Sequence, residues 1–198
     1  MALKIGIVGA GIAGLATALR LKAQGHDVVV FESNTYTGGK LHALELEGYR
    51  FDLGPSLFTM PHFVDELFTL FNEQPRDYFN YIQKENVCNY FWEDGTRFVA
   101  SGNREAFVQE FSQTFNEDPK NVSNFLDNSG LKYELTSPLF IEQSLHRLST
   151  YASLKTLKAI VKLPSLDVHK TLFKTLKSYF KNPKSLQFFS RHATYNGS

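Results

Sequence analysis

Three glycines near the N-terminus, Gly9, Gly11 and Gly14, have the spacing of a phosphate-binding turn between a strand and a helix. In such a turn Gly9 permits the sharp bend, Gly11 lets a pyrophosphate approach the backbone, and Gly14 lets the helix pack closely on the strand. The helix begins at about Ile12 and Ala13, so that its free N–H groups and positive dipole end face the phosphates. These residues therefore predict a site for the diphosphate of a dinucleotide.

Glu32 gives that prediction its context, because it lies 18 residues after Gly14 at the end of a β-branched run. A carboxylate at this place accepts hydrogen bonds from both ribose hydroxyls, and its charge repels the 2′-phosphate of NADP. The glycine spacing alone is a weak signal, and a glycine-rich turn that binds nothing is the alternative. A nicotinamide-dependent enzyme would share these features, so the type of dinucleotide stays open at this point.

The elements that position these residues form a βαβ unit of about 30 residues. A short strand over residues 4–8 precedes the turn, apolar residues then recur at helical spacing as far as Leu19, and Gly25 ends the helix. The continuous run 27–31 predicts a parallel strand that is buried on both faces.

After residue 40 the sequence predicts two β-hairpins and several helices. The hairpins cover residues 41–52 and 89–100, and a helix starts at Pro61 between them. Beyond the second hairpin the chain is predicted to be helical, with Asp118-Pro119 capping one helix and Pro164 separating two basic helices at the end.

Two further segments, Gly38-Gly39-Lys40 and Gly54-Pro55, together with Glu32, resemble the amine-oxidase-like flavoprotein superfamily. Within it, residues 48–61 resemble the bacterial carotenoid desaturases of the phytoene dehydrogenase family, and residues 191–197 are similar to a further stretch of that family. The resemblance covers essentially the whole chain, and its motifs together are specific.

This resemblance implies FAD as the cofactor and assigns the remaining site residues. Gly39 and Lys40 would lie along the phosphate and flavin side of FAD, with Lys40 holding phosphate charge. Most relatives carry arginine there, and lysine is a point charge without the planar fork; an ordinary solvated lysine is the alternative. Gly54, Pro55 and Ser56 would border the isoalloxazine ring.

The resemblance also implies a reaction, the desaturation of a carotenoid. A hydride would pass to flavin N5 and a proton would leave the neighbouring carbon while the polyene delocalises the developing positive charge. The Gly-Gly-Lys variant looks like the subgroup that desaturates hydroxylated carotenoid ends at the 3,4 bond. No catalytic acid or base is assigned, since the nearest titratable residues, His42, Asp52 and His62, are better explained as structural.

Three alternatives to this reaction remain. The first is a superfamily oxidase that acts on an amine or a porphyrinogen, and the second is a flavin-dependent carotenoid isomerase. The third is a non-enzymatic fragment that binds only a membrane.

Aromatic stripes at helical spacing, such as Phe107, Phe111 and Phe115, have two interpretations. Such stripes usually form a hydrophobic core, and the alternative is an apolar tunnel that binds a long polyene.

The charge is divided unevenly along the chain. Residues 1–146 carry 11 Lys/Arg against 19 Asp/Glu, a net of −8, whereas residues 147–198 carry 10 Lys/Arg against Asp167 alone, a net of +9. Basic amphipathic helices, the second over residues 167–181, predict contact with an anionic membrane surface, and a solvated face is the equally good alternative. Nothing else in the chain suggests nucleic acid. The lysines of the predicted membrane face are Lys155, Lys158, Lys162, Lys170, Lys174, Lys177 and Lys181.

The predicted fold class is α/β. A partial Rossmann-like FAD-binding domain with hairpins is expected over residues 1–100, and an inserted, mostly helical substrate and membrane region over residues 101–198. We expect the chain to stop before the C-terminal strands of the FAD domain, and therefore to bind FAD weakly by itself. A single cysteine and the absence of a signal peptide or membrane span favour a cytoplasmic location at the inner face of the membrane, and no metal is expected.

Overall fold

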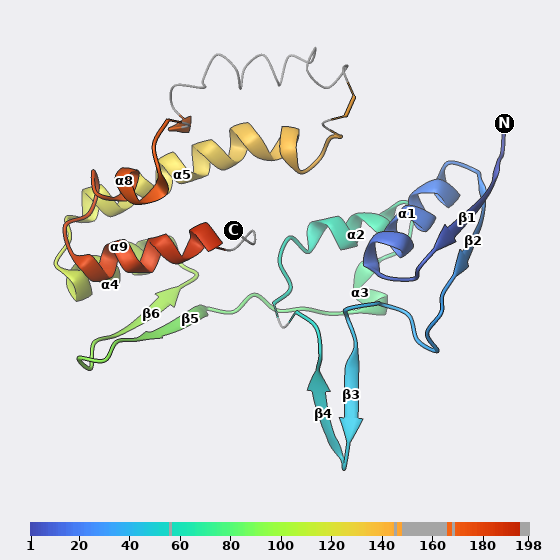
Figure 1. Ribbon diagram of the computed structural model, residues 1–198, viewed down its shortest axis with the longest axis horizontal. Coiled ribbons are helices and arrows are strands. Elements are labelled where there is room, and N and C mark those ends of the chain that lie inside the picture. Colours follow the sequence, from blue (N-terminus) through green and yellow to red (C-terminus); the bar gives the residue numbers. More distant parts are fainter. Residues whose placement is uncertain (56, 145, 148–165, 168, 195–198) are drawn as a thin grey trace. The chain divides into compact units, whose positions relative to one another are not determined.

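The computed structural model describes residues 1–55, 57–144, 146–147, 166–167 and 169–194 (Figure 1). They belong to two compact units, Met1–Ile82 and Gln83–Ser198. The division falls earlier than the boundary that we expected at residue 100, because the second hairpin packs with the helices that follow it.

The first unit begins with the predicted βαβ arrangement. Strands β1 (Lys4–Val8) and β2 (Asp27–Phe31) pair in parallel, and helix α1 (Ile12–Ala23) connects them. Gly25 follows the helix with a φ of 86°, the left-handed conformation that glycine adopts without steric cost. Helix α1 packs closely at Gly14, where an added Cβ would lie 2.0 Å from the carbonyl oxygen of Gly9.

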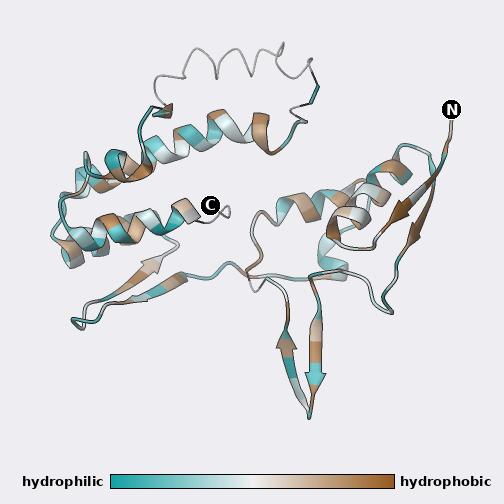
Figure 2. Ribbon diagram, viewed as in Figure 1, coloured by the Kyte–Doolittle hydropathy of each residue, from teal (hydrophilic) through white to brown (hydrophobic). Residues whose placement is uncertain are grey.

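The two parallel strands are more exposed than their composition predicts. Val29 and Phe31 on β2 are 52% and 59% exposed, and Val8 at the end of β1 is 91% exposed. The prediction that the second strand is buried on both faces is therefore wrong for the described residues. Side chains of β2 alternate between half-buried and exposed positions, so the described residues cover only one of its faces, although both strands are hydrophobic (Figure 2).

A hairpin and two short helices complete the first unit. Strands β3 (Ala43–Leu46) and β4 (Tyr49–Asp52) are antiparallel and turn at Glu47-Gly48, both with positive φ. Helix α2 (His62–Thr69) is joined to α1 by a two-pronged ion pair between Arg20 and Glu66, with N···O distances of 3.1 and 3.0 Å. Helix α3 (Pro75–Tyr78), which the sequence analysis missed, follows α2.

The described residues of the second unit form four α-helices and a short 3₁₀ helix, which pack with a hairpin. The hairpin pairs β5 (Asn86–Phe91) with β6 (Arg97–Ser101). The helices are α4 (Arg104–Phe115), α5 (Pro119–Phe140), α8 (Leu172–Leu176), α9 (Pro183–Ser190) and the 3₁₀ helix η2 (Arg191–Thr194). The predicted Asp118 cap is confirmed, because its Oδ1 accepts a hydrogen bond of 2.9 Å from the N–H of Lys120.

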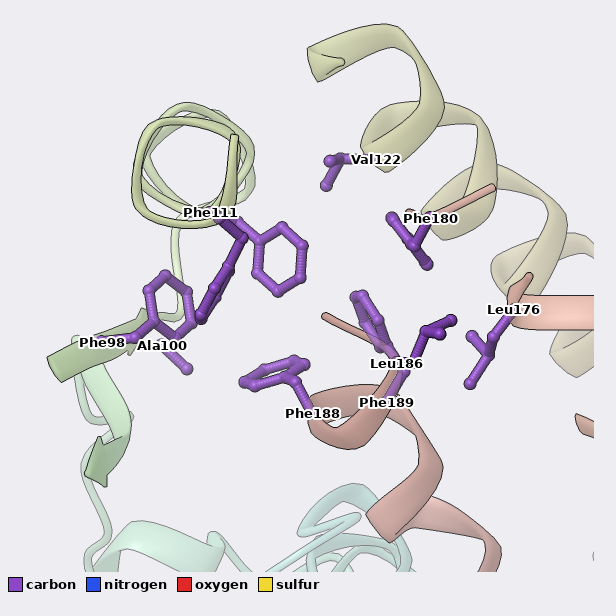
Figure 3. Close-up of a cluster of buried hydrophobic side chains, with 10 residues drawn as sticks. Phe98, Ala100, Phe111, Val122, Leu176, Phe180, Leu186, Phe188 and Phe189 are labelled. Atoms are coloured by element: carbon purple, nitrogen blue, oxygen red, sulfur yellow. The ribbon is translucent and has the colours of Figure 1, made fainter. Parts of the chain in front are cut away.

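An aromatic core holds this unit together (Figure 3). Phe111 and Phe115 of α4 are at most 1% exposed, and their ring centroids lie 4.7 Å apart. Phe98 from β6 and Phe188 from α9 contact the same cluster, with centroids 5.5 and 5.3 Å from Phe111. Each buried phenylalanine contributes about 1.5–3 kcal/mol, and each ring pair about 0.5–1.5 kcal/mol more. The interpretation of this stripe as core is confirmed.

The predicted basic helix over residues 167–181 does not form. Among the described residues of that range, those of α8 alone are α-helical, and Thr171 caps this helix by accepting a hydrogen bond of 3.2 Å from the N–H of Lys174. The buried carboxylate of Glu117 then accepts the N–H groups of Lys181 and Asn182 at 2.8–3.2 Å, so the backbone leaves the helical path there.

The other lysine stripe can be placed only in part. Lys155, Lys158 and Lys162, and the break expected at Pro164, lie outside the described residues. Lys170, Lys174, Lys177 and Lys181 are exposed, although they do not share one helix. None of the described helices is both long enough and apolar enough to cross a membrane.

The contact between α1 and the glycine turn generates a prediction for Gly14→Ala. The new Cβ would meet the carbonyl oxygen of Gly9, so the helix or the turn must shift, at a cost of about 1–3 kcal/mol. Gly130→Ala in α5 is the matched control, since nothing lies within 4 Å of its added Cβ and alanine favours a helix interior by up to about 1 kcal/mol. Denaturant unfolding of the complete protein should show the two variants changing stability in opposite directions. Equal stability of the two variants would contradict this account of the turn.

Candidate functional site

The turn between β1 and α1 has no side-chain cap for the first N–H groups of the helix among the described residues. Gly9 has a φ of 98°, and its N–H donates to the carbonyl of Phe31 at 2.7 Å, which holds the turn against the end of β2. Gly11 is the N-cap residue of α1 and supplies no side chain to cap it, and the first turn contains no acidic residue. The first helical hydrogen bond runs from the N–H of Leu15 to the carbonyl of Gly11 at 2.9 Å.

The N–H groups of Ile12, Ala13 and Gly14 lie in the first turn of α1, where no earlier carbonyl of the helix is available to accept them. Together with the positive end of the helix dipole they can receive an anion, and a phosphate group suits them. The predicted role of the glycine motif is thus compatible with its geometry.

Glu32 lies beside this turn and is held by hydrogen bonds. Its Oε2 accepts the N–H of Ala10 at 2.7 Å, and its Oε1 accepts the N–H and the side-chain Nδ2 of Asn34 at 2.9 and 3.0 Å. The N–H groups of Asn34 and Ala10 lower the pKa of Glu32, which is therefore ionised at neutral pH. A carboxylate has about four acceptor positions, and Oε2 has only one partner among the described residues, so it can accept a further donor.

The glycine doublet packs directly on the glycine turn. The N–H of Gly38 donates to the carbonyl of Ala10 at 2.8 Å, and Gly38 forms a parallel bridge with Gly11. Gly39 has a φ of 61°, and its added Cβ would lie 3.1 Å from the Cα of Gly11. Side chains at the doublet would separate these two segments, so glycine there serves close backbone approach.

Gly54 brings the third segment into contact with the same place. An added Cβ at Gly54 would lie 2.1 Å from the carbonyl oxygen of Lys40, and the N–H of Leu53 donates to the carbonyl of His42 at 2.9 Å. The side chain of Lys40 is exposed. The predicted residues Gly39, Lys40 and Gly54 are therefore neighbours in space as well as in motif.

A cavity of about 490 Å³ lies where these segments meet. Five of the predicted site residues line it, namely Gly11, Ile12, Ala13, Lys40 and Pro55. Of the other predicted residues, Gly9, Gly14, Glu32, Gly39 and Gly54 support or flank this wall, and Ser56 lies outside the described residues.

The sequence analysis missed the apolar part of the lining. Leu41, Leu57, Phe58 and Thr59 line the cavity together with Gly38. Leu57 and Phe58 are 66% and 49% exposed. Their position directly after the Gly54-Pro55 motif was the signal available in the sequence.

The titratable candidates do not belong to the lining. His42 stacks on Tyr36 with centroids 3.9 Å apart, and Asp52 forms an ion pair of 2.9 Å with Arg50. The ring of His62 lies 4.3 Å from that of Phe63. Among the described residues that line the cavity, Lys40 is the one ionisable side chain.

Known proteins similar to this chain point in one direction. A family model, flavin containing amine oxidoreductase, matches residues 12–194. A 1-hydroxycarotenoid 3,4-desaturase from Flavobacterium sp. (strain P99-3) is 56% identical over 192 residues, which are 97% of this chain and 39% of that protein. A carotenoid 3,4-desaturase from Haloarcula japonica is 29% identical over 191 residues, 96% of this chain and 38% of that protein.

The chain thus spans about two fifths of the length of these relatives. A solved structure, a CLA-producing fatty acid isomerase from P. acnes, aligns with 79% of this chain and 44% of that chain at 20% identity, with a TM-score of 0.37 that supports no argument. The family model, in contrast, covers nearly all of the chain and confirms the predicted flavoprotein superfamily. The chain belongs to the flavin containing amine oxidoreductase family.

Proposed function

We propose that this chain supplies the cofactor-binding part of an FAD-dependent desaturase that acts on a carotenoid. The observation that carries the proposal is the cavity itself, which the N-terminal residues of α1, without a side-chain cap, and several apolar side chains line together. A flavin enzyme with a hydrocarbon substrate needs both kinds of lining, one for phosphate and one for an apolar chain. The names of the relatives support the choice of substrate.

Several residues of the turn fit FAD. In the proposal its pyrophosphate lies at the N-terminus of α1, where Gly11 lets it approach the backbone, and a ribose hydroxyl donates to Oε2 of Glu32. Lys40 contributes positive charge, and Pro55, with Gly54 and Ser56, borders the flavin ring. Because Oε1 of Glu32 already accepts from Asn34, we expect Oε2 to make the main ribose contact.

The contribution of the protein to the reaction is binding and orientation. The chemistry that bound FAD supplies is the acceptance of a hydride from one carbon of the substrate, while the neighbouring carbon loses a proton to water or a base. The described lining offers no carboxylate or imidazole as that base. Leu41, Leu57 and Phe58 would pack along the polyene and hold it beside the cofactor, while water that enters the open side of the cavity can take the proton.

The proposed bond is the 3,4 bond of a hydroxylated carotenoid. The relative that is 56% identical over 97% of this chain carries that activity in its name, and the Gly38-Gly39-Lys40 variant agrees with it.

A test of this activity is the product formed in a host that makes hydroxylated carotenoids. Expression of the complete protein should yield a pigment two mass units lighter than its substrate, with a longer chromophore. An isomer of unchanged mass would indicate an isomerase, and oxidation of an amine without a new pigment would indicate another oxidase of the family. Either result would overturn the proposed reaction.

Glu32→Ala tests the cofactor site. Loss of a charged acceptor should weaken FAD binding by the complete protein about ten- to a hundred-fold, measured by flavin fluorescence titration. Asn34→Ala is the matched control, because it removes a donor to Oε1 while Oε2 stays available to the ribose. Its effect should be several-fold smaller. Unchanged flavin affinity in Glu32→Ala would remove this residue from the site, and tight NADP binding by the unmodified protein would also contradict its role.

We further propose that the second unit is a helical region inserted into the FAD domain, and that it contacts the cytoplasmic face of an anionic membrane. A substrate dissolved in the bilayer has to be bound at the membrane. Four exposed side chains of this unit carry positive charge that an anionic membrane attracts, namely Lys170, Lys174, Lys177 and Lys181. Since these lysines do not form one helical stripe, the proposal rests on their charge and not on an amphipathic helix.

Liposome binding should therefore depend on charge. Each lysine near an anionic surface contributes about 1 kcal/mol, screened over a Debye length of about 8 Å at physiological salt. Changing Lys170, Lys174, Lys177 and Lys181 to Gln should reduce sedimentation of the complete protein with anionic liposomes. The control changes four exposed lysines elsewhere to Gln, namely Lys4, Lys22, Lys84 and Lys120. Equal losses in the two quadruple variants, or equal binding to neutral liposomes, would count against the proposed surface.

A further inference from the structure

Phe58 is an aromatic side chain that faces an open cavity and is still fixed in place. It is 49% exposed and lines the cavity beside Leu57. Its ring makes edge-on contacts with two other rings, those of Phe79 and Tyr81, with centroid distances of 6.0 and 5.3 Å and interplanar angles of 68° and 78°. One side of the ring is therefore packed and another is available to a ligand.

A polar network holds the rings behind Phe58. The guanidinium of Arg76 lies 4.0 Å from the ring centroid of Tyr81, and Arg76 forms an ion pair of 2.6 Å with Asp65 on α2. The hydroxyl of Tyr81 donates to the same Oδ2 of Asp65 at 2.8 Å. Arg76 and Asp65 thus fix Tyr81 from two sides, and Tyr81 in turn fixes Phe58.

We propose that Phe58 is the wall against which the hydrocarbon chain of the substrate rests, an inference that depends on the proposed function of the cavity. The side chains of Leu57, Leu41 and Ile12, which line the same cavity, have no hydrogen-bond donor or acceptor. The polar edge of a flavin would require such groups. A polyene needs none and gains from each buried apolar group. Arg76, Asp65 and Tyr81 act as positioning residues, because a ring that is held before binding loses less freedom when the substrate arrives.

The test uses the complete protein loaded with FAD and a carotenoid substrate in detergent. Phe58→Ala should raise the KM about tenfold or more, while FAD affinity and the visible flavin spectrum stay as in the unmodified protein. Phe58→Leu should restore most of the affinity, because it returns an apolar surface. Phe91→Ala is the control, since Phe91 is an exposed phenylalanine on β5 outside the cavity, and its KM should not change.

Arg76→Ala separates positioning from direct contact. Alone it should raise the KM by a smaller factor than Phe58→Ala, and in the Phe58→Ala background it should have no further effect, since no ring remains to be positioned. Fully additive effects of the two substitutions would show that Arg76 does not act through Phe58.

The outcomes also separate this inference from the proposed function. An active protein in which Phe58→Ala keeps its KM would overturn the inference and leave the proposed function intact. A loss of FAD affinity that accompanies the rise in KM would assign Phe58 to the flavin and would overturn it as well. Absence of both FAD binding and desaturation in the unmodified protein would overturn the proposed function and the inference with it.

Discussion

Three backbone segments approach one another around the glycine turn without side chains between them. Gly14 packs on the carbonyl of Gly9, Gly39 on the Cα of Gly11, and Gly54 on the carbonyl of Lys40, and an added Cβ would lie 2.0, 3.1 and 2.1 Å away, respectively. This close approach brings the N-terminus of α1, the doublet and the Gly54-Pro55 loop to the wall of one cavity. A larger residue at Gly14, Gly39 or Gly54 would push these segments apart and would separate the N-terminus of α1 from the apolar residues of the cavity.

The two units reach stability by different means. In the first unit, Ala10 and Pro75 are the only described residues that are buried, and its segments are joined by backbone hydrogen bonds and by half-exposed ring contacts such as that of Phe58 with Tyr81. The second unit has an aromatic core in which Phe111 contacts the rings of residues from β6, α4 and α9. The arrangement of the first unit therefore depends on the path of its backbone, whereas the second unit is stabilised by buried apolar area.

The lining of the cavity combines backbone at a helix N-terminus with apolar side chains, as is common in sites for small molecules. At the glycine turn, donors come from the backbone and need no charged side chain, which leaves the surroundings free for apolar residues. Phe58 is one of these apolar side chains, and residues from α2, α3 and the chain that follows support its ring. In the proposed binding of a hydrocarbon chain, the network around Asp65 would keep this ring in one position.

Local signals in the sequence determined the βαβ unit, both hairpins, the Asp118 cap and the family. Turn glycines, β-branched runs and capping residues act over a few positions, so their effects can be read without the rest of the fold. The same holds for the contact between Gly14 and Gly9, which lies within one short motif, whereas the contacts of Gly39 with Gly11 and of Gly54 with Lys40 join separate segments. Glu32 could be placed for the same reason, although its contacts with Ala10 and Asn34 could not.

Tertiary structure alone decided the features that depend on distant partners. The second hairpin joined the helical unit because Phe98 finds its packing partners on α4 and α9. The predicted lysine helix is reduced to α8, and at its C-terminal side the N–H groups of Lys181 and Asn182 donate to Glu117, more than 60 positions earlier, instead of to helical carbonyls. Phe58 becomes a fixed wall only when residues as distant as Tyr81 fold behind it. Helical spacing and apolar composition indicate whether a residue tends to be helical or buried. Which partner it packs against depends on the tertiary structure, because that partner can lie far away in the sequence.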